Sequence, residues 1–162
     1  MNLCRPNRLI MGCSRLVLAA AIATLSTAVP ADAQSDTWRE VDNPYQEDLD
    51  HRVGATLNPG VEIDGVRWRS LLLEADGNEV VAAGEDVDLK VTVSFENRNP
   101  ASVKLLVILL LEDGNGAPLE RVELGTFKVG GQRLKERIDS ATVTGDVLLA
   151  TRRVYLFCEV IR

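Results

Sequence analysis

The residues that could carry chemistry are few in this sequence, and they do not form a catalytic set. His51 is the single histidine of the 162 residues. With one histidine and few cysteines, a zinc site cannot be assembled from nitrogen and sulfur ligands. A Ser-His-Asp set would have to use His51, and the serines lack the Gly-x-Ser-x-Gly context of a nucleophile elbow. We therefore expect His51 to be a solvated surface residue.

Carboxylates are plentiful, with 24 Asp and Glu residues, so inventory alone leaves a carboxylate-based hydrolase open. The segments 76–79 and 113–115 carry oxygen ligands of the kind that calcium prefers. Both have the Asp-Gly-Asn composition of turns, and neither has the length of an EF-hand loop. The sequence therefore predicts turns there, and no metal or cofactor site.

The first 33 residues have the pattern of a secretory signal peptide. Three arginines precede an apolar run over residues 16–29, and residues 31–33 (Ala-Asp-Ala) fit the small-x-small cleavage motif. The run is 14 residues long, whereas a membrane-spanning helix needs about 20. We predict cleavage before Gln34, no integral membrane segment in the mature chain, and a periplasmic or secreted location.

Cleavage there leaves 129 residues, enough for one domain. The signal holds three of the 18 basic residues and one of the 24 acidic ones, so the mature chain has a net charge near −8. Phosphate groups would be repelled at long range. We expect no nucleic-acid partner.

Cysteine chemistry is not expected in the mature chain. Cys4 and Cys13 leave with the signal, so Cys158 has no partner for an internal disulfide. Its position is in phase with the apolar Val154 and Leu156. We predict a buried side chain rather than a reactive thiol.

Alternating apolar residues predict a β-sheet domain over residues 60–162. Val87 to Phe95 are apolar at every second position, the mark of a strand with one face in a core. Turn residues separate further short strands, which we place at 61–75, 80–81, 87–96, 103–111, 119–129, 132–143 and 154–161. This spacing favours an all-β, immunoglobulin-like antiparallel β-sandwich of about seven strands, with a closed barrel as the alternative.

Two of these strands carry predictions about register. In strand 119–129 the apolar residues change phase, which predicts a β-bulge at residues 125–126. Strand 132–143 is weakly patterned and suits an exposed edge, with Leu134 and Ile138 expected to face the core.

Three stretches of this domain resemble a known family. Residues 74–81 (Glu-Ala-Asp-Gly-Asn-Glu-Val-Val) lead into 84–93 (Gly-Glu-Asp-Val-Asp-Leu-Lys-Val-Thr-Val), and 111–116 (Leu-Glu-Asp-Gly-Asn-Gly) follow. Over about residues 61–160 the order resembles the carbohydrate-binding C-terminal domain of bacterial O-antigen ABC transporter ATPases. It is similar also to other bacterial immunoglobulin-like modules of adhesins and cell-surface proteins. The resemblance implies a sandwich fold.

Residues 34–59 lack periodicity and read as an acidic, flexible arm in front of the sheet domain. They contain six acidic residues and two arginines, with Asn-Pro in the middle. Trp38 and Tyr45 are the aromatic groups of this arm. They are candidates to latch the arm onto the domain or to meet a partner.

One feature of the sheet points to binding. The strand 103–111 is apolar on both faces, and the last strand carries aromatic residues opposite its core positions. Each strand of a sandwich buries only one face, so the second face must be covered by the arm, a loop such as 147–149, another copy or a partner. The candidate partner-binding residues are Leu106, Ile108, Leu110, Tyr155 and Phe157.

The sequence thus favours a non-catalytic, exported β-sandwich of the bacterial cell envelope that binds a protein partner or itself through an apolar sheet face. A glycan-binding module is the alternative, with Trp38, Tyr45 and Trp68 as the candidates for stacking on sugar rings. A carboxylate-based hydrolase comes third, because it would need a cleft lined by converging carboxylates.

Overall fold

Ten strands and one short helix are formed by residues 38–75 and 81–162, the part of the chain that this computed structural model describes. The predicted signal peptide lies outside the described residues. The elements are β1 (Arg39–Val41), β2 (Tyr45–Asp50), β3 (Thr56–Leu57), β4 (Val61–Ile63), β5 (Val66–Ala75), β6 (Asp86–Asn97), β7 (Val103–Glu112), β8 (Pro118–Val129), β9 (Arg133–Thr144), α1 (Gly145–Ala150) and β10 (Arg153–Ile161).

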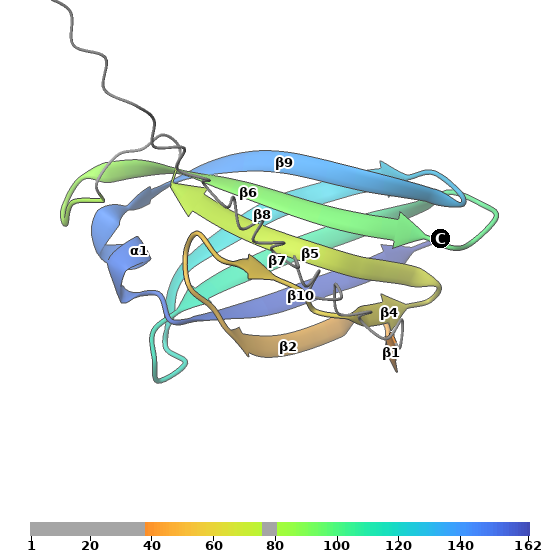
Figure 1. The fold of residues 1–162 in the computed structure, drawn as a ribbon, viewed down its shortest axis with the longest axis horizontal. Coiled ribbons are helices and arrows are strands. Elements are labelled where there is room, and N and C mark those ends of the chain that lie inside the picture. The colour runs from red at the N-terminus through yellow and green to blue at the C-terminus, as the bar shows by residue number, and fades with distance from the viewer. Residues whose placement is uncertain (1–37, 76–80) are drawn as a thin grey trace, which may run out of the picture. The chain divides into compact units, whose positions relative to one another are not determined.

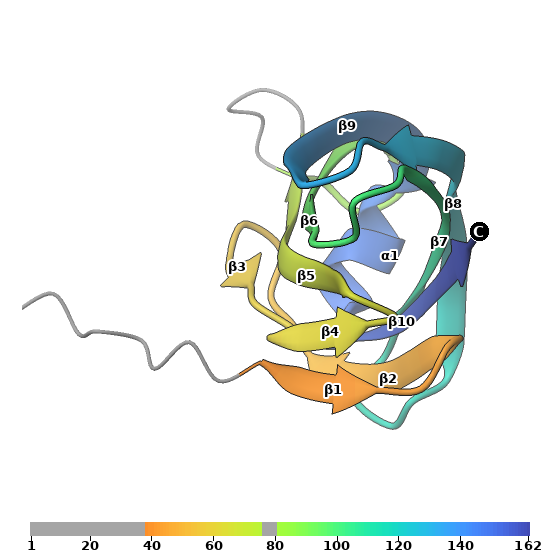
Figure 2. The same ribbon diagram turned by 90° about the vertical axis from the view of Figure 1, so that its right-hand side faces the viewer.

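The strands form two sheets that face each other (Figures 1 and 2). The six-stranded sheet has the order β1-β4-β5-β6-β9, with β3 paired to β5, and the four-stranded sheet has the order β2-β10-β7-β8. The pairing is antiparallel except between β1 and β4. The prediction of a mostly β, sandwich-like arrangement is confirmed, with more strands than the seven expected.

Strand β6 shows why the two layers form. Its apolar residues from Val87 to Phe95 are all buried, and the polar residues between them face outward. Burial of one face per strand is what the period of two predicts. The last strand behaves in the same way, and Cys158 is buried as expected.

A row of four aromatic side chains crosses the core between the sheets. Tyr45 from β2 meets the edge of Trp68 from β5, with ring centroids 6.2 Å apart. Trp68 lies 4.9 Å from Phe95 of β6, and Phe95 lies 5.9 Å from Phe127 of β8. The row therefore runs from one edge strand of the four-stranded sheet, past β5 and β6 of the other sheet, to the opposite edge strand of the four-stranded sheet.

The arm prediction is wrong for the residues between 39 and 57. They form β1, β2 and β3, so the sheets begin well before residue 60. Strand β2 pairs along its whole length with β10. The Asn43 side chain extends this pairing, because it accepts from Val160 N at 3.0 Å and donates to Val160 O at 2.9 Å. Backbone pairing and the burial of Tyr45 outweigh the acidic composition.

The predicted β-bulge in β8 is present one residue earlier than expected. The pairing of β7 with β8 shifts between Val107 and Ile108, which leaves Leu124 as the extra residue beside Gly125. Gly125 has a φ of 64°, a backbone conformation that glycine adopts readily. The bulge lets the apolar residues on both sides of it face the core.

Strand β9 is an edge strand as predicted, but its two faces are exchanged. Leu134 and Ile138 are 63% and 54% exposed. The opposite face, which includes Arg137 and Asp139, is the one turned inward. These two side chains form an ion pair of 2.7 Å, and the Arg137 guanidinium lies 5.1 Å from the centroid of Phe127. The ion pair and the aromatic contact make the inward placement of charged residues tolerable.

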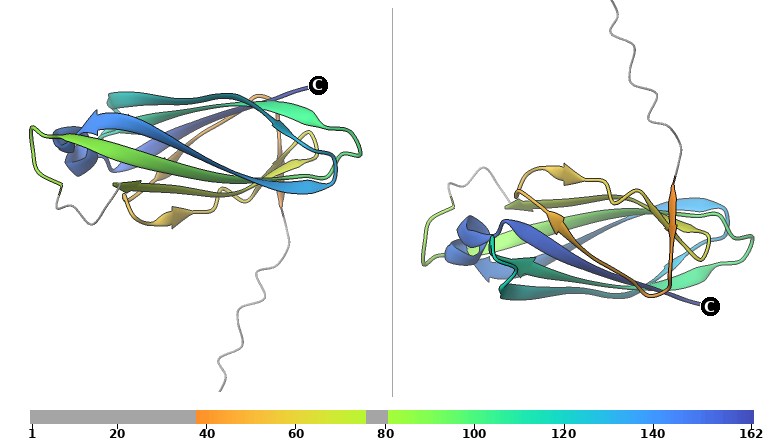
Figure 3. Two further views of the ribbon diagram at one scale, coloured as in Figure 1. Left: turned by 90° about the horizontal axis from the view of Figure 1, so that it is seen from above. Right: turned by 90° about the horizontal axis from the view of Figure 1, so that it is seen from below.

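The helix α1 was not indicated by the strand pattern. It lies at one end of the sandwich, and its Leu148 is buried (Figures 1 and 3). Gly145 begins the helix so close to Ala82 that a Cβ atom would lie 1.9 Å from the Ala82 carbonyl oxygen. With six residues, this one helix of the described ranges is too short to cross a bilayer.

Candidate functional site

The five residues predicted to form a binding face lie side by side on the outer surface of the four-stranded sheet. The pairing of β7 with β10 sets Tyr155 opposite Leu110 and Phe157 opposite Ile108. Leu106 is the next outward residue of β7, opposite Glu159. We call these five residues the apolar strip: Leu106, Ile108, Leu110, Tyr155 and Phe157.

The strip belongs to the two central strands of its sheet, and its members are half-buried. The residues between them, such as Leu109 and Leu156, point inward and are fully buried. Both strands therefore carry apolar side chains on their outer face as well as in the core, as the sequence indicated. Neighbouring side chains shield part of each strip residue, and the remainder is open to a contact.

The groups expected to close over this face lie elsewhere in the described part of the chain. Tyr45 is 4% exposed and belongs to the core. Trp38 lies over Arg67 and Arg69, at 5.1 and 5.8 Å from the guanidinium carbons, against β5 in the other sheet. Leu148 packs into the core, and Figures 2 and 3 show no described strand or helix over the outer face of the four-stranded sheet. In the described part of the chain, neither the arm nor residues 147–149 cover the apolar strip.

The flanks of the apolar strip are polar. On the β2 side, Gln46 stands opposite Phe157, and its Oε1 accepts from the Tyr155 hydroxyl at 2.6 Å. On the β8 side, Arg121 and Glu123 form an ion pair of 2.8 Å. An apolar centre with a polar rim is the usual anatomy of a protein interface.

Glu112 lies at one end of the same face and is buried with its Oε2 lacking a hydrogen-bond partner among the described residues. Burial raises the pKa of the Glu112 carboxyl, and the negative charge of Asp48 raises it further. Asp48 itself is 3.4 Å from Arg153. This end of the face is therefore rich in carboxylates, which Arg153 partly balances.

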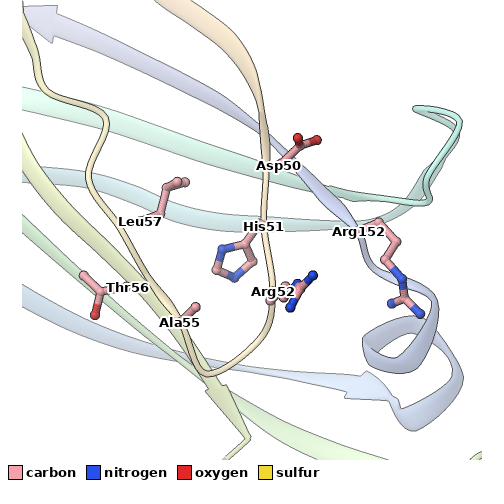
Figure 4. A pocket seen from close by; sticks show the side chains of 7 residues that line it. All are labelled: Asp50, His51, Arg52, Ala55, Thr56, Leu57 and Arg152. Atoms are coloured by element: carbon pink, nitrogen blue, oxygen red, sulfur yellow. The ribbon is translucent and has the colours of Figure 1, made fainter.

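His51 is not the solvated residue that the sequence suggested. It is 4% exposed, at the end of β2, where its backbone N–H donates to Arg152 O at 2.9 Å. It lines a pocket together with side chains from three segments (Figure 4): Asp50, Arg52, Ala55, Thr56, Leu57 and Arg152. Burial lowers the pKa of the imidazole, and its Nε2 has no hydrogen-bond partner among the described residues.

The geometry of this pocket does not assemble a catalytic pair. Figure 4 shows the Asp50 carboxylate pointing away from the imidazole. The Arg152 guanidinium is engaged, because its Nη1 donates to the carbonyl oxygens of Leu149 and Thr151, each at 2.7 Å. An imidazole without an orienting carboxylate lacks the base arrangement of a catalytic triad.

A second hollow is lined by carboxylates from Glu40, Asp42 and Asp64. The Asp64 carboxylate accepts from Asn43 Nδ2 at 2.9 Å and lies 3.8 Å from Arg162. Its role is therefore to hold the β1–β2 connection. Within residues 38–75 and 81–162, no three His, Cys, Asp or Glu side chains are arranged to hold a metal ion.

The turn interpretation is confirmed for residues 113–115, where Asp113 Oδ1 accepts from the backbone of Asn115 at 2.7 Å and of Ala117 at 2.9 Å. The other oxygen-rich segment, 76–79, lies outside the described residues. Cys158 is fully buried, and burial raises the pKa of its thiol. Of the aromatic residues considered for sugar stacking, Tyr45 and Trp68 are core residues, and Trp38 alone remains near the surface.

Comparison with known proteins adds little. No family model matches the sequence, and no curated protein matches it. Among solved structures, the chain is similar to a DUF1425 family member from Shewanella sp. PV-4, at 17% identity, with 57% of this chain and 78% of that one covered and a TM-score of 0.33.

A second structure is the enzymatically active domain of tailspike protein 4 from bacteriophage CBA120. The identity is 13%, the TM-score 0.24, and the match covers 74% of this chain and 17% of that one. Neither similarity is strong enough to carry an argument about function. Of the resemblance described above, the structure supports the two-sheet β fold.

Proposed function

We propose that the protein is a non-catalytic, exported component of the bacterial cell envelope that binds a protein surface through the apolar strip. The observation that carries the proposal is the contiguity of the five strip residues on a sheet face with no described element over it. In this proposal the fold is an immunoglobulin-like sandwich, and the mature chain is periplasmic or secreted.

The strip is large enough to matter energetically. Full burial of a side chain of this size contributes roughly 1.5–3 kcal/mol. Since about a third or less of each strip residue is still exposed, we expect at most about 1 kcal/mol from covering each one. Five such contributions total at most about 5 kcal/mol, which is near the lower end of the cost of association, so a specific contact also needs the polar groups around the strip.

The two alternatives have less support. A glycan module needs exposed aromatic rings, and two of the three candidate rings lie in the core. A hydrolase needs converging carboxylates or an activated base. The Asp64 carboxylate is bound by Asn43, and the His51 imidazole has no acidic partner beside it.

The test is a pair of matched double variants in the native host. Ile108→Ser with Phe157→Ser removes the centre of the strip, whereas Leu134→Ser with Ile138→Ser removes two exposed apolar side chains from the outer face of the other sheet. We expect both variants to fold. Cross-linked partner complexes in the envelope should be lost only in the strip variant.

Two results would contradict the proposal. One is a strip variant that keeps its cross-linked partners, and the other is a strip variant that unfolds while the control stays stable, which would make the strip a part of the core. Export is tested separately by N-terminal sequencing of the envelope form. We expect Gln34 as the first residue, and a retained Met1 would show that the signal prediction is wrong.

A further inference from the structure

The face that carries the apolar strip is charged oppositely at its two ends, and this pattern points to one occupant. We propose that the strip binds the strip of a second copy of the chain, face to face about a two-fold axis. This inference rests on the proposed function and specifies its partner.

The pairing of β7 with β10 arranges the face in five rows. The central row is Phe157 with Ile108, and the rows next to it are Tyr155 with Leu110 and Glu159 with Leu106. Arg153 with Glu112 forms the row at one end, and Ile161 with Lys104 forms the row at the other. Successive rows are two positions apart along each strand, so they lie about 6.8 Å from one another.

The end with Glu112 is acidic. Strand β2 adds Asp50 opposite Arg153 and Asp48 opposite Tyr155. Arg153 is the one basic residue among the four, and it is already 3.4 Å from Asp48. Strand β8 adds Arg121 opposite Leu110, but its guanidinium is paired with Glu123, so negative charge exceeds positive charge at this end.

The other end is basic: its two lysines outnumber Glu159, which lies in the adjacent row opposite Leu106. Lys104 of β7 stands directly opposite Lys128 of β8. Like charges in directly opposed positions of a sheet destabilise it. Within the described residues, neither ammonium group forms a salt bridge that would offset the repulsion.

Consider a two-fold axis that lies between the two faces, runs across the strands and passes through the central row. It places the acidic end of each copy over the basic end of the other. It places Phe157 and Ile108 near their own counterparts, and Leu110 over Leu106 of the second copy. Lys104 of each copy then lies over Glu112 of the other, because both residues belong to β7 and each is four positions from Ile108. Because such an interface is isologous, each favourable charge contact occurs twice.

The area of the face limits the stability of the dimer. Five rows span about 27 Å and four strands about 15 Å, so the face covers roughly 400 Å² per copy. Stable interfaces bury about 1,200–2,000 Å² in total. We therefore expect a reversible dimer that dissociates on dilution and weakens as salt screens the charged ends.

The experiment is sedimentation equilibrium of the mature chain over a wide concentration range, at low and high salt. Two charge-swapped variants provide the test: Lys104→Glu and Glu112→Lys. Each alone should have its dimerisation constant weakened at least tenfold. An equimolar mixture of the two should dimerise again, because both ends of the mixed dimer are then complementary. Circular dichroism shows whether each variant is folded.

Several outcomes would overturn the inference. They are a wild-type chain that stays monomeric at every concentration, a dimer that survives the lysine swap, a mixture of variants that does not associate, and a dimer lost in the Leu134→Ser, Ile138→Ser variant. A monomeric chain whose strip still cross-links to a different envelope protein would overturn the second copy as occupant and leave the proposed function standing. A chain that neither dimerises nor cross-links to an envelope protein would overturn both the dimer and the proposed function.

Discussion

Tyr45 gives a sharp test of whether the N-terminal strands belong to the folded domain. The ring is 4% exposed and meets the edge of Trp68 at a centroid distance of 6.2 Å. Its hydroxyl donates to Glu47 Oε2 at 2.7 Å. A flexible arm would have none of these constraints.

The expected cost of removing the ring follows from these contacts. Truncation of a buried aromatic side chain to alanine costs about 3–5 kcal/mol, which includes the loss of the aromatic pair. Typical domains have a total stability of about 5–15 kcal/mol. Tyr45→Ala should therefore lower the urea midpoint severely. The matched control is Tyr155→Ala, which removes the same side chain from a half-buried outer position and should cost about 1 kcal/mol.

The hydroxyl can be tested separately with Tyr45→Phe. The lost hydrogen bond should cost about 1 kcal/mol, below the value for a buried charged acceptor, because the Glu47 side chain is 31% exposed. The Tyr45 hydroxyl, together with Arg39, lowers the pKa of Glu47 in the folded protein. A lowered folded pKa gives stability that is present above pH 4.5 and is lost as the pH falls through the folded value. The difference between Tyr45→Phe and the wild type should therefore shrink in acid.

Urea unfolding followed by circular dichroism measures all three variants. If Tyr45→Ala costs no more than Tyr155→Ala, residues 45–50 are not docked on the sheet, and the placement of β2 is wrong.

Three further perturbations follow from single contacts. Val91→Asp places a charge in the core and should cost more than 4 kcal/mol, whereas the outward-facing Thr92→Asp should cost about 1 kcal/mol. Equal melting temperatures for the two variants would refute the register of β6. Asn97 is fully buried, and its Nδ2 donates to three backbone carbonyl oxygens. Asn97→Asp should therefore cost about 3 kcal/mol of stability, and protonation of the new carboxylate in acid should restore part of it. A melting temperature unchanged from the wild type would refute these contacts. Glu112→Gln should raise the melting temperature at pH 7, because the raised pKa of Glu112 means that its charged form destabilises the fold. The gain in melting temperature should vanish below pH 4, and a lower melting temperature at pH 7 would contradict this prediction.

The sequence was a good guide where strands alternate and are long. The strands β6, β7 and β10 were predicted within a residue or two, because their apolar residues must face one core. The burial of Cys158 and the change of phase in β8 follow from the same periodicity. The five strip residues could be placed on one face because paired strands set opposite residues side by side.

Strands whose inward positions are polar could not be predicted. In β2 the inward face holds Glu47, whose carboxylate is bound by Arg39 and by the Tyr45 hydroxyl, and this contact does not show in composition. In β9 the inward positions include the ion pair of Arg137 with Asp139, so the hydrophobic pattern indicates the wrong face.

Single-residue irregularities were also missed. Arg69 is an extra residue in β5, so that Trp68 and Leu71 are both buried although they are three apart. His51 is buried because its backbone is fixed to Arg152, more than 100 positions away in the sequence. Contacts of this range cannot be read from neighbouring residues.

The pairing of β2 with β10 has a consequence for how the chain is completed. Tyr45 stands opposite Cys158, so the central strand of one layer comes from the last residues and its edge from the first ones described. Contacts of such long sequence separation make folding slow, because a large loop must close before they form. In a chain whose β10 has not yet been synthesised, β2 has no partner strand and β7 is paired only with β8. The four-stranded layer is therefore complete only after the nine-residue strand β10 has been synthesised.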